Sequence, residues 1–388
     1  MNKIHNLLHE LCPSGVVYKK LEEVTKQVNI GINPRKFFKL NPSDACGFYV
    51  TVRELNGLNG VTKTEKTDLI NKEALDIIQS RANIEIGDIL FSNTGTVGKL
   101  ALVNDKVENW RVNEGIYVIK PIKEALNPRF LYYYLESNLA YSDYSKMFTG
   151  STLKHITQKA LLSLVLPVPP LEVQCEIVNI LDGFTHYKSE LISELSRELK
   201  ARRQQYEFYR NVLVNKDKNK YLCDILKIKN GKDYKMFGEG NIPVYGSGGI
   251  IAYTSKFAYN KPSVLVPRKG SIDKLYYVEE PFWNVDTIFY TEIDEKVVLP
   301  KYVFYCLENE HLEKLNTAGG VPSLNQTVLN KVKIYIPSLD EQKNIVSKLD
   351  NLFRFVNNLT RELPIEIEKR QKQYEYYRDK LLSFKEVE

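Results

Sequence analysis

Two long stretches of the chain repeat apolar positions at the spacing of a helix. The alternation of three- and four-residue steps is the pattern of a coiled-coil seam. In residues 169–215 the stepping positions are Leu191, Leu195, Leu199, Arg202, Tyr206, Tyr209 and Leu213. In residues 337–383 they are Leu352, Val356, Leu359, Leu363, Ile367, Arg370, Tyr374, Tyr377 and Leu381. The pattern predicts two helices of about 43–45 residues, each roughly 65 Å long.

The two stretches are copies of one another. Aligned without a gap, 18 of their 47 positions are identical. A lone helix with a single apolar stripe has nothing to bury it against, so we expect the two copies to pack together. The pairing is antiparallel if the intervening block connects the end of the first helix to the start of the second. Pro364 is predicted to kink or interrupt the second helix.

The blocks before the two helices correspond more loosely. Residues 88–100 (DILFSNTGTVGKL) match 263–275 (SVLVPRKGSIDKL), and both blocks alternate short strands with glycine turns. The predicted fold class is α+β. It has two similar mixed α/β domains, 1–168 and 216–336, joined by two long antiparallel helices, 169–215 and 337–388. The helices form an intramolecular coiled coil with a pseudo-two-fold repeat.

Net charge and cysteine usage narrow the class of protein. The chain has 54 Lys and Arg against 48 Asp and Glu, a net charge of +6. The positive excess lies in the two globular blocks, which suggests two heads that bind a polyanion. Five cysteines without a Cys-x-x-Cys pair disfavour disulfides and structural zinc. No secretion signal or long apolar run is present, so a cytoplasmic protein is expected.

Catalytic motifs are not evident in the chain. Gly95–Leu100 resembles a phosphate-binding loop, but Asn93 replaces its first glycine and Leu100 replaces the Ser or Thr that holds magnesium. His5 and His9 have the spacing of a metal-chelating pair on a helix, and we favour solvated histidines instead. No metal site is therefore predicted.

The repeated motifs resemble one known family. Each helix opens with Pro-(Pro/Ser)-Leu-x-x-Gln and ends in Arg-x-x-Gln-Tyr-Glu-x-Tyr-Arg, at 202–210 and 370–378. The second block adds Gly246-Ser-Gly-Gly-Ile250 and Val266-Pro-Arg-Lys-Gly-Ser-Ile272. With the duplication, these features resemble the specificity subunit of type I restriction–modification systems over nearly the whole chain.

The resemblance implies a DNA-binding subunit without catalytic activity. Its two target recognition domains would bind a bipartite, asymmetric double-stranded DNA target with an unread spacer. Methyltransferase subunits, normally two, and restriction subunits would dock on the frame. These partners, and not this chain, would use S-adenosylmethionine, ATP and magnesium. The alternative is a stand-alone nuclease or methyltransferase whose site is not recognisable in the sequence.

Each recognition domain needs Lys or Arg for phosphates and a few polar side chains for base edges. Arg268 is the preferred base-reading residue, because it follows an apolar strand and lies in a glycine turn. Asn325 and Gln326 have a second interpretation, as caps of the following helix. The candidate DNA-binding residues are Arg35, Lys36, Asn93, Thr94, Thr96, Lys99, Lys154 and His155 in the first block, and Lys232, Tyr234, Lys235, Ser247, Arg268, Lys269, Ser271, Lys274, Asn325 and Gln326 in the second.

The tails of the two long helices are predicted to dock partner subunits. These helices are close to neutral, which argues against DNA contact, and Tyr and Arg are enriched at protein interfaces. We prefer seam packing over base stacking for the four tyrosines. The candidate docking residues are Arg202, Tyr206, Tyr209, Arg210, Arg370, Tyr374, Tyr377 and Arg378.

Overall fold

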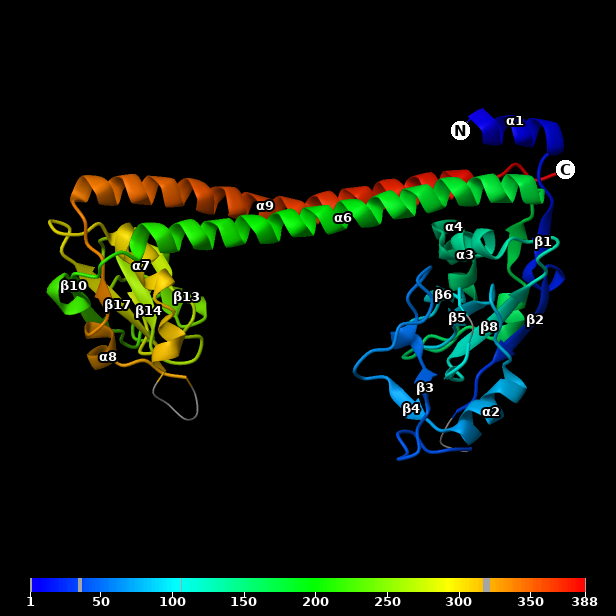
Figure 1. Cartoon of the computed structure of the whole chain (residues 1–388), viewed down its shortest axis with the longest axis horizontal. Helices are drawn as coiled ribbons and strands as arrows, with labels where there is room; N and C mark the ends of the chain where they lie inside the picture. Colours follow the sequence, from blue (N-terminus) through cyan, green and yellow to red (C-terminus); the bar gives the residue numbers. More distant parts are fainter. Residues whose placement is uncertain (1, 34–36, 106, 317–321, 388) are drawn as a thin grey trace. The chain divides into compact units, whose positions relative to one another are not determined.

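The computed structural model describes residues 2–33, 37–105, 107–316 and 322–387 (Figure 1). The chain divides into two compact units, Met1–Ile192 with Glu366–Glu388, and Ser193–Ile365. Each unit contains one globular block together with a part of each long helix. The two predicted blocks are therefore each built on both helices, and not on one helix each.

The two long helices form as the apolar pattern predicts. Helix α6 (Leu171–Val214) and helix α9 (Leu339–Leu382) have 44 residues each. Helix α9 continues through Pro364, so the predicted interruption at this residue is wrong. A proline removes one N–H from the backbone ladder, and the rest of the ladder and the packing along the helix hold the helical conformation.

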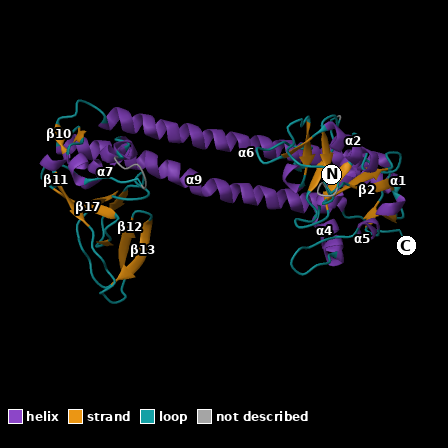
Figure 2. Cartoon of the chain, turned by 90° about the horizontal axis from the view of Figure 1, so that it is seen from below, coloured by secondary structure: helices purple, strands orange, loops and turns teal. Residues whose placement is uncertain are grey.

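Within each unit the two helices run in opposite directions, as the colours of Figure 1 show, and Figure 2 shows them side by side from below. In the first unit, Lys188 in the first half of α6 donates to Gln371 in the second half of α9 at 2.9 Å. In the second unit, a residue late in α6 meets a residue early in α9. The ring centroids of Tyr206 and Phe353 lie 5.8 Å apart. Late residues of one helix therefore meet early residues of the other, which confirms the antiparallel pair.

The first globular block has two sheets and a set of short helices. A four-stranded antiparallel sheet has the order β2-β8-β5-β6, and a three-stranded sheet has the order β4-β3-β7. The elements are α1 (Asn2–Leu11), β1 (Tyr18–Lys20), β2 (Thr25–Ile30), β3 (Gly47–Val50), β4 (Asp68–Ile70), α2 (Lys72–Arg81), β5 (Ile89–Ser92), β6 (Leu100–Leu102), β7 (Trp110–Val112), β8 (Ile116–Pro121), α3 (Pro128–Glu136), α4 (Asn138–Tyr144), α5 (Gln158–Leu162) and β9 (Val165–Pro167).

The second globular block repeats this plan. Its four-stranded sheet has the order β11-β17-β14-β15 and its three-stranded sheet the order β13-β12-β16. The elements are β10 (Lys220–Tyr221), β11 (Leu226–Asn230), β12 (Ile242–Gly246), β13 (Gly249–Thr254), β14 (Ser263–Pro267), β15 (Tyr276–Val278), β16 (Trp283–Asn284), β17 (Ile288–Ile293), α7 (Pro300–Asn309), α8 (Gln326–Asn330) and β18 (Lys333–Ile334). Equal strand orders in the two blocks confirm the repeat that the sequence predicts.

In each block, the larger sheet has an apolar core on both of its faces. In β5, Ile89 and Phe91 belong to the core with α3, whereas Leu90 points to the core beneath the smaller sheet. In β14, Val264 and Leu265 divide in the same way between two cores. A strand that is buried on both faces explains the unbroken apolar runs ILF and VLV in the sequence.

The repeated glutamine at the start of each long helix attaches that helix to the preceding domain. Gln174 accepts from the backbone N–H of Asn127 at 2.8 Å and donates to the carbonyls of Ala125 and Pro169. Gln342 makes the same bonds with Leu299, Val297 and Pro337. Both side chains are fully buried. An amide that satisfies three backbone groups explains why this position is a glutamine in both copies.

The tail of each long helix is attached to a domain by a glutamate, an arrangement we call the helix–domain clamp. In the first clamp, Glu136 on α3 accepts from the hydroxyl of Tyr374 at 3.3 Å and pairs with Arg378 at 3.1 Å. In the second, Glu308 on α7 accepts from Tyr206 at 2.8 Å and pairs with Arg210 at 2.8 Å. The tail motif that repeats in the sequence thus forms these clamps.

The tyrosine of the first clamp is kept as a neutral donor. Burial, reinforced by the negative charge of Glu136, raises the pKa of Tyr374 to about 12. The hydroxyl therefore retains its proton at neutral pH and can donate to the carboxylate. The same causes raise the pKa of Tyr206 beside Glu308.

The substitution Glu136→Ala tests the clamp. It leaves the buried donors of Tyr374 and Arg378 without their acceptor, so we expect the free energy of unfolding in urea to fall by about 1–3 kcal/mol. Glu124→Ala, at an exposed position of the same domain, is the matched control and should leave the free energy unchanged. Equal effects of the two substitutions would contradict the clamp.

Candidate nucleic-acid interface

In the first domain, the turn after β5 is bonded to a second loop. We call residues 92–99 and 149–156 together turn pair 1. The carbonyl of Asn93 accepts from the N–H of Ile156 at 3.0 Å, and the N–H of Gly95 donates to the carbonyl of Lys154 at 2.8 Å. The N–H of Asn93 also donates to the carbonyl of Gly115 at 2.8 Å. These three bonds hold the turn from both sides.

The second domain contains the same construction. We call residues 267–274 and 322–325 together turn pair 2. The backbone carbonyl of Arg268 accepts from the N–H of Leu324 at 2.9 Å, and its backbone N–H donates to the carbonyl of Thr287 at 2.8 Å. The N–H of Gly270 donates to the carbonyl of Pro322 at 3.0 Å. Arg268 therefore occupies the place of Asn93, and the partners of the bonds correspond one for one.

A glycine in the left-handed region closes each turn. Gly95 has φ +76° and Gly270 has φ +82°, which explains the glycine that the two sequence motifs share. A Cβ on Gly270 would lie 3.4 Å from Oγ of Ser247. The tip of the β12–β13 hairpin therefore rests on turn pair 2, and it brings Ser247 next to the glycine turn.

Turn pair 2 presents a cationic side chain on a fixed backbone. The guanidinium of Arg268 lies 5.7 Å from the centroid of the Phe289 ring, and within the described part of the chain it makes no hydrogen bond or ion pair. Lys269 and Lys274 are exposed, and Ser271 is partly exposed. The structure thus assembles four of the predicted residues of this domain, with Ser247, at one surface.

The other candidates of the second domain lie on neighbouring segments. Lys232, Tyr234 and Lys235 belong to the loop after β11, which the indole N–H of Trp283 anchors by donating to the carbonyl of Lys232 at 2.8 Å. Asn325 caps α8, because its side chain accepts from the N–H of Val328 at 2.8 Å. The capping interpretation of Asn325 is confirmed.

Gln326 and the candidates of the first domain differ in whether their side chains are exposed or already hydrogen-bonded within the domain. Gln326 donates to the side chain of Asn230 at 3.4 Å. In turn pair 1, Thr96 and Lys154 are exposed. The ammonium of Lys99 already donates to the carbonyl of Val52 at 2.7 Å, so this lysine is engaged within the domain. Arg35 and Lys36 lie outside the described residues.

The helix tails correct part of the docking prediction. Tyr206, Arg210, Tyr374 and Arg378 are buried in the helix–domain clamps, so their surfaces are not available to another protein. The reason is that each domain supplies the glutamate that these side chains need.

The other four predicted docking residues retain an accessible surface. Tyr209 is exposed, as is Arg370, which pairs with Glu366 on its own helix. Arg202 and Tyr377 are partly exposed. Tyr377 also follows the seam prediction, because its ring lies 6.1 Å from that of Phe184.

Four exposed aromatic residues on the same helices were not identified as docking candidates from the sequence. Tyr187 (64% exposed) and Phe355 (48%) occupy the same position of the repeat, as do Phe208 (61%) and Tyr376 (61%). We call these four side chains the aromatic stripe. Their recurrence at matching positions was a readable signal, but a periodicity analysis that seeks the buried seam passes over positions outside it.

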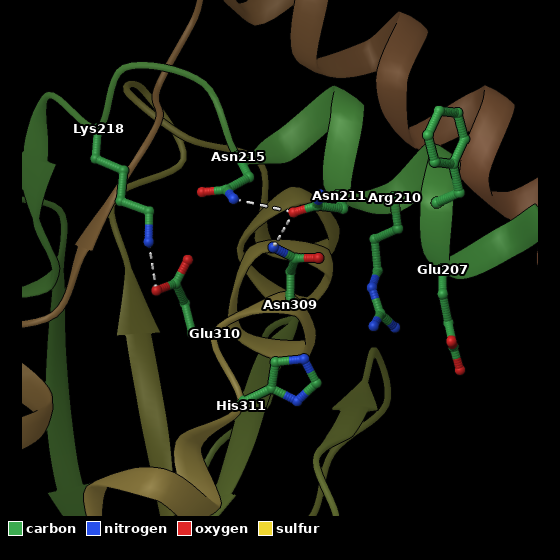
Figure 3. A pocket seen from close by; sticks show the side chains of 9 residues that line it. Glu207, Arg210, Asn211, Asn215, Lys218, Asn309, Glu310 and His311 are labelled. Atoms are coloured by element: carbon green, nitrogen blue, oxygen red, sulfur yellow. Dashed lines mark hydrogen bonds and ion pairs between the residues drawn. The ribbon is translucent and has the colours of Figure 1, made fainter. Parts of the chain in front are cut away.

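A pocket of about 500 Å³ lies beside the second clamp (Figure 3). The amide of Asn211 accepts from Asn309 at 3.3 Å and from Asn215 at 2.9 Å. Lys218 pairs with Glu310 at 2.6 Å. The polar groups drawn in this pocket mostly bond one another, which makes it a joint between α6 and α7 and not a ready site for a small molecule.

Within residues 2–33, 37–105, 107–316 and 322–387, no group of three or more His, Cys, Asp or Glu side chains could hold a metal ion. Among the helices of these residues, none combines the length and the apolar character that a membrane span requires.

The chain contains two related domains whose turns match in backbone but differ in side chains. Each domain is attached to parts of both long helices. This arrangement defines a class of protein that presents two different sets of side chains on one repeated scaffold. Comparison with known families then identifies the class by name. The family model for the type I restriction modification DNA specificity domain matches residues 13–201 and again 215–369. The chain belongs to this family, and it is a DNA specificity subunit, the non-catalytic component of a type I restriction–modification system.

Individual relatives agree with this assignment. A putative type I restriction enzyme specificity subunit of Haemophilus influenzae is 32% identical over 399 residues, covering 96% of each chain. The EcoR124I/EcoR124II specificity subunit of Escherichia coli is 30% identical over 304 residues, covering 67% of this chain and 72% of the other.

Solved structures share the fold. The HsdS subunit from Thermoanaerobacter tengcongensis superimposes with a TM-score of 0.62 at 17% identity, over 96% of this chain and 97% of the other. A chain from a structure described as showing complex assembly and conformational transition of the type I R-M system has a TM-score of 0.74 at 18% identity, over 95% and 98% of the two chains.

The turn geometry predicts a difference between two neighbouring glycines. Gly270→Ala forces a side chain into a left-handed turn and towards Ser247, so we expect a loss of about 1–2 kcal/mol in the free energy of unfolding. Gly248→Ala, in the adjacent hairpin, has nothing within 4 Å of its added Cβ and should have little effect. Urea unfolding of both variants provides the measurement, and an equal loss in both would contradict the assigned role of Gly270.

Proposed function

We propose that the two turn pairs read the two halves of a bipartite DNA target. The observation that carries the proposal is that both domains hold the same turn by the same three backbone bonds but place different side chains on it. A constant backbone with variable side chains suits two readers that share a docking geometry and differ in sequence preference.

Arg268 is the proposed base-reading residue of the second domain. Its guanidinium is unpaired within the described residues, and an arginine that donates two bonds to O6 and N7 is the commonest specific contact to guanine. Lys232, Lys235, Lys269 and Lys274 are exposed and would contact phosphates. Ser247 and Ser271 supply short polar side chains, and Tyr234, Asn325 and Gln326 remain candidates at the edge of this surface.

For the first domain we propose contacts from Thr96, Lys154 and His155, with Thr94 holding the imidazole of His155 in position. Asn93 acts behind them, because its side chain is buried and bonded to the backbone. Lys99 would contribute to DNA binding only after its bond to Val52 opens. Arg35 and Lys36 remain candidates from the sequence alone.

The helix pair is the proposed ruler of the target. A 44-residue helix is about 66 Å long, and a stiff pair of such helices would fix the number of unread base pairs between the half-sites. In this proposal the recognition domains are 1–168 and 216–336, and the helical segments are 169–215 and 337–388.

The partners in this proposal are methyltransferase subunits, two in number, and restriction subunits. The aromatic stripe supports two equivalent docking places, because each pair of its members repeats at one position of the duplicated helix. Arg202, Tyr209, Arg370 and Tyr377 would lie at the edges of these places. The partners would use S-adenosylmethionine, ATP and magnesium, and the complex would act in the cytoplasm.

Arg268→Ala provides the test of base reading. We expect specific DNA binding, measured with the methyltransferase partner present, to weaken by about 1–3 kcal/mol for the lost bidentate contact. Lys274→Ala, the matched control in the same turn pair, should weaken binding to cognate and random DNA alike and reduce the salt dependence. Loss of affinity to the same degree on both DNAs for Arg268→Ala would make it a phosphate contact.

Docking on the aromatic stripe has its own test. The double variant Phe208→Ala and Tyr376→Ala should assemble more weakly with the methyltransferase subunit in size-exclusion chromatography, because buried aromatic anchors dominate interface energies. Met236→Ala, at an 81% exposed residue in the loop after β11, is the control and should assemble normally. Normal assembly of the double variant would place the docking surface elsewhere.

A further inference from the structure

Turn pair 1 contains a chain of three polar side chains with defined directions. The side-chain nitrogen of Asn93 donates to the carbonyl of Glu114 at 3.0 Å, which turns Oδ1 of the same amide towards Thr94. Oγ1 of Thr94 lies 2.6 Å from that Oδ1 and 2.8 Å from Nδ1 of His155. The three groups come from the two loops that the backbone bonds hold together.

The directions of these hydrogen bonds follow from what each atom can do. An amide oxygen can only accept, so the single hydroxyl proton of Thr94 must point to Asn93. Towards His155 the hydroxyl oxygen is therefore an acceptor, and Nδ1 must carry a proton. In the neutral imidazole the second nitrogen, Nε2, is then unprotonated and is a hydrogen-bond acceptor.

The position of His155 is fixed as well as its tautomer. Its backbone exchanges two hydrogen bonds with Thr149, at 2.8 and 2.9 Å, in addition to the contact with Thr94. The residue is partly exposed, and within the described residues Nε2 has no hydrogen-bond partner. A preorganised acceptor with a free nitrogen at the surface is what reading of a base edge requires.

We infer that His155 reads one base of the DNA target through Nε2 and selects a base with an exocyclic amino group, adenine or cytosine. This inference rests on the proposed function and deepens it. In the major groove only the amino groups of adenine and cytosine donate hydrogen bonds. Guanine and thymine offer an acceptor at the corresponding edge, and an acceptor on the protein disfavours both.

The second domain carries hydrogen-bond donors at the positions that correspond to the acceptor site of turn pair 1. Arg268 replaces Asn93, Lys269 replaces Thr94, and Ser323 replaces His155, since Lys269 and Ser323 form the bridge that Thr94 and His155 form in turn pair 1. Turn pair 2 is thus dominated by donors, whereas turn pair 1 presents an acceptor. Asn93 and Thr94 are positioning residues for the imidazole, and His155 contacts the base.

The tautomer can be measured without DNA. Two-bond proton–nitrogen correlation spectra of the full chain, labelled with ¹⁵N in its five histidines, report which ring nitrogen carries the proton. The resonance of His155 is identified by its loss in His155→Gln. We expect the proton on Nδ1, and Thr94→Val should release it to a mixture of tautomers. A wild-type proton on Nε2 would overturn the inference.

Base selection is measured by mapping methylated sites in DNA from cells that make this chain with its partner subunits. We expect His155→Ala to accept any base at one position of one half-site, and Thr94→Val to relax the same position. His155→Arg, which replaces an acceptor with donors, should shift that position to guanine. His5→Ala, at an exposed histidine of α1, is the control and should leave the target unchanged.

Two outcomes overturn the inference in different ways. An unchanged target in both His155→Ala and His155→Arg would remove His155 from base reading while leaving the bipartite reader intact. The lack of any sequence-specific methylation with the wild-type chain would overturn the proposed function, and the inference would fall with it.

Discussion

The antiparallel packing of α6 and α9 is the constraint on which the rest of the structure depends. Each helix has one apolar stripe over 44 residues, and in each unit a part of one helix covers the stripe of the other. Because the two copies run in opposite directions, the start of one helix lies beside the tail of the other. Every domain therefore meets one helix start and one helix tail, and a single repeated sequence supplies both attachments.

The attachments explain why the repeated motif contains polar residues at apolar spacing. Gln174 and Gln342 satisfy backbone groups of the preceding domain, and the tail tyrosines and arginines meet Glu136 and Glu308. A buried arginine without its glutamate would be costly, so the domain and the helix specify each other. This coupling attaches each domain to the tail of one long helix.

Much of this architecture could be predicted from the sequence, because duplication and helical periodicity are strong signals. Both helices begin two residues after their predicted starts, and α6 ends one residue before its predicted end. Helix α9 ends at Leu382, six residues before the predicted bound at 388. The shared glycine of the two blocks marks the same turn. The role of the tail motif was not predictable in the same way. Tyr206 and Arg210 have the composition of an interface, and only the fold reveals that the interface lies within the chain. At Pro364 the sequence predicts a break that the structure does not have. The helix continues through the proline because the backbone hydrogen bonds and packing of the rest of α9 hold the helical conformation.

The candidate site was predictable by residue type but not by grouping. Arg268, Lys269 and Ser271 are adjacent in sequence and remain together, whereas Ser247 joins them through a hairpin contact that no spacing rule contains. The relation between Thr94 and His155, 61 residues apart, depends on a pair of loops whose bonds are visible only in three dimensions. The direction of that hydrogen bond, and with it the chemistry of the free nitrogen, follows from Asn93, a buried residue that does not reach the surface.

The central claim is that one stiff helix pair carries two independent readers, and its most direct test changes the length of the pair alone. Seven residues of matching heptad sequence are inserted after Ile192 in α6 and after Ile365 in α9, where both helices pass from one unit to the other. Each insertion adds about 10 Å of helix, the length of about three base pairs. Methylation mapping should then show both half-sites unchanged and the unread spacer about three base pairs longer. An unchanged spacer, or an altered half-site sequence, would contradict the account.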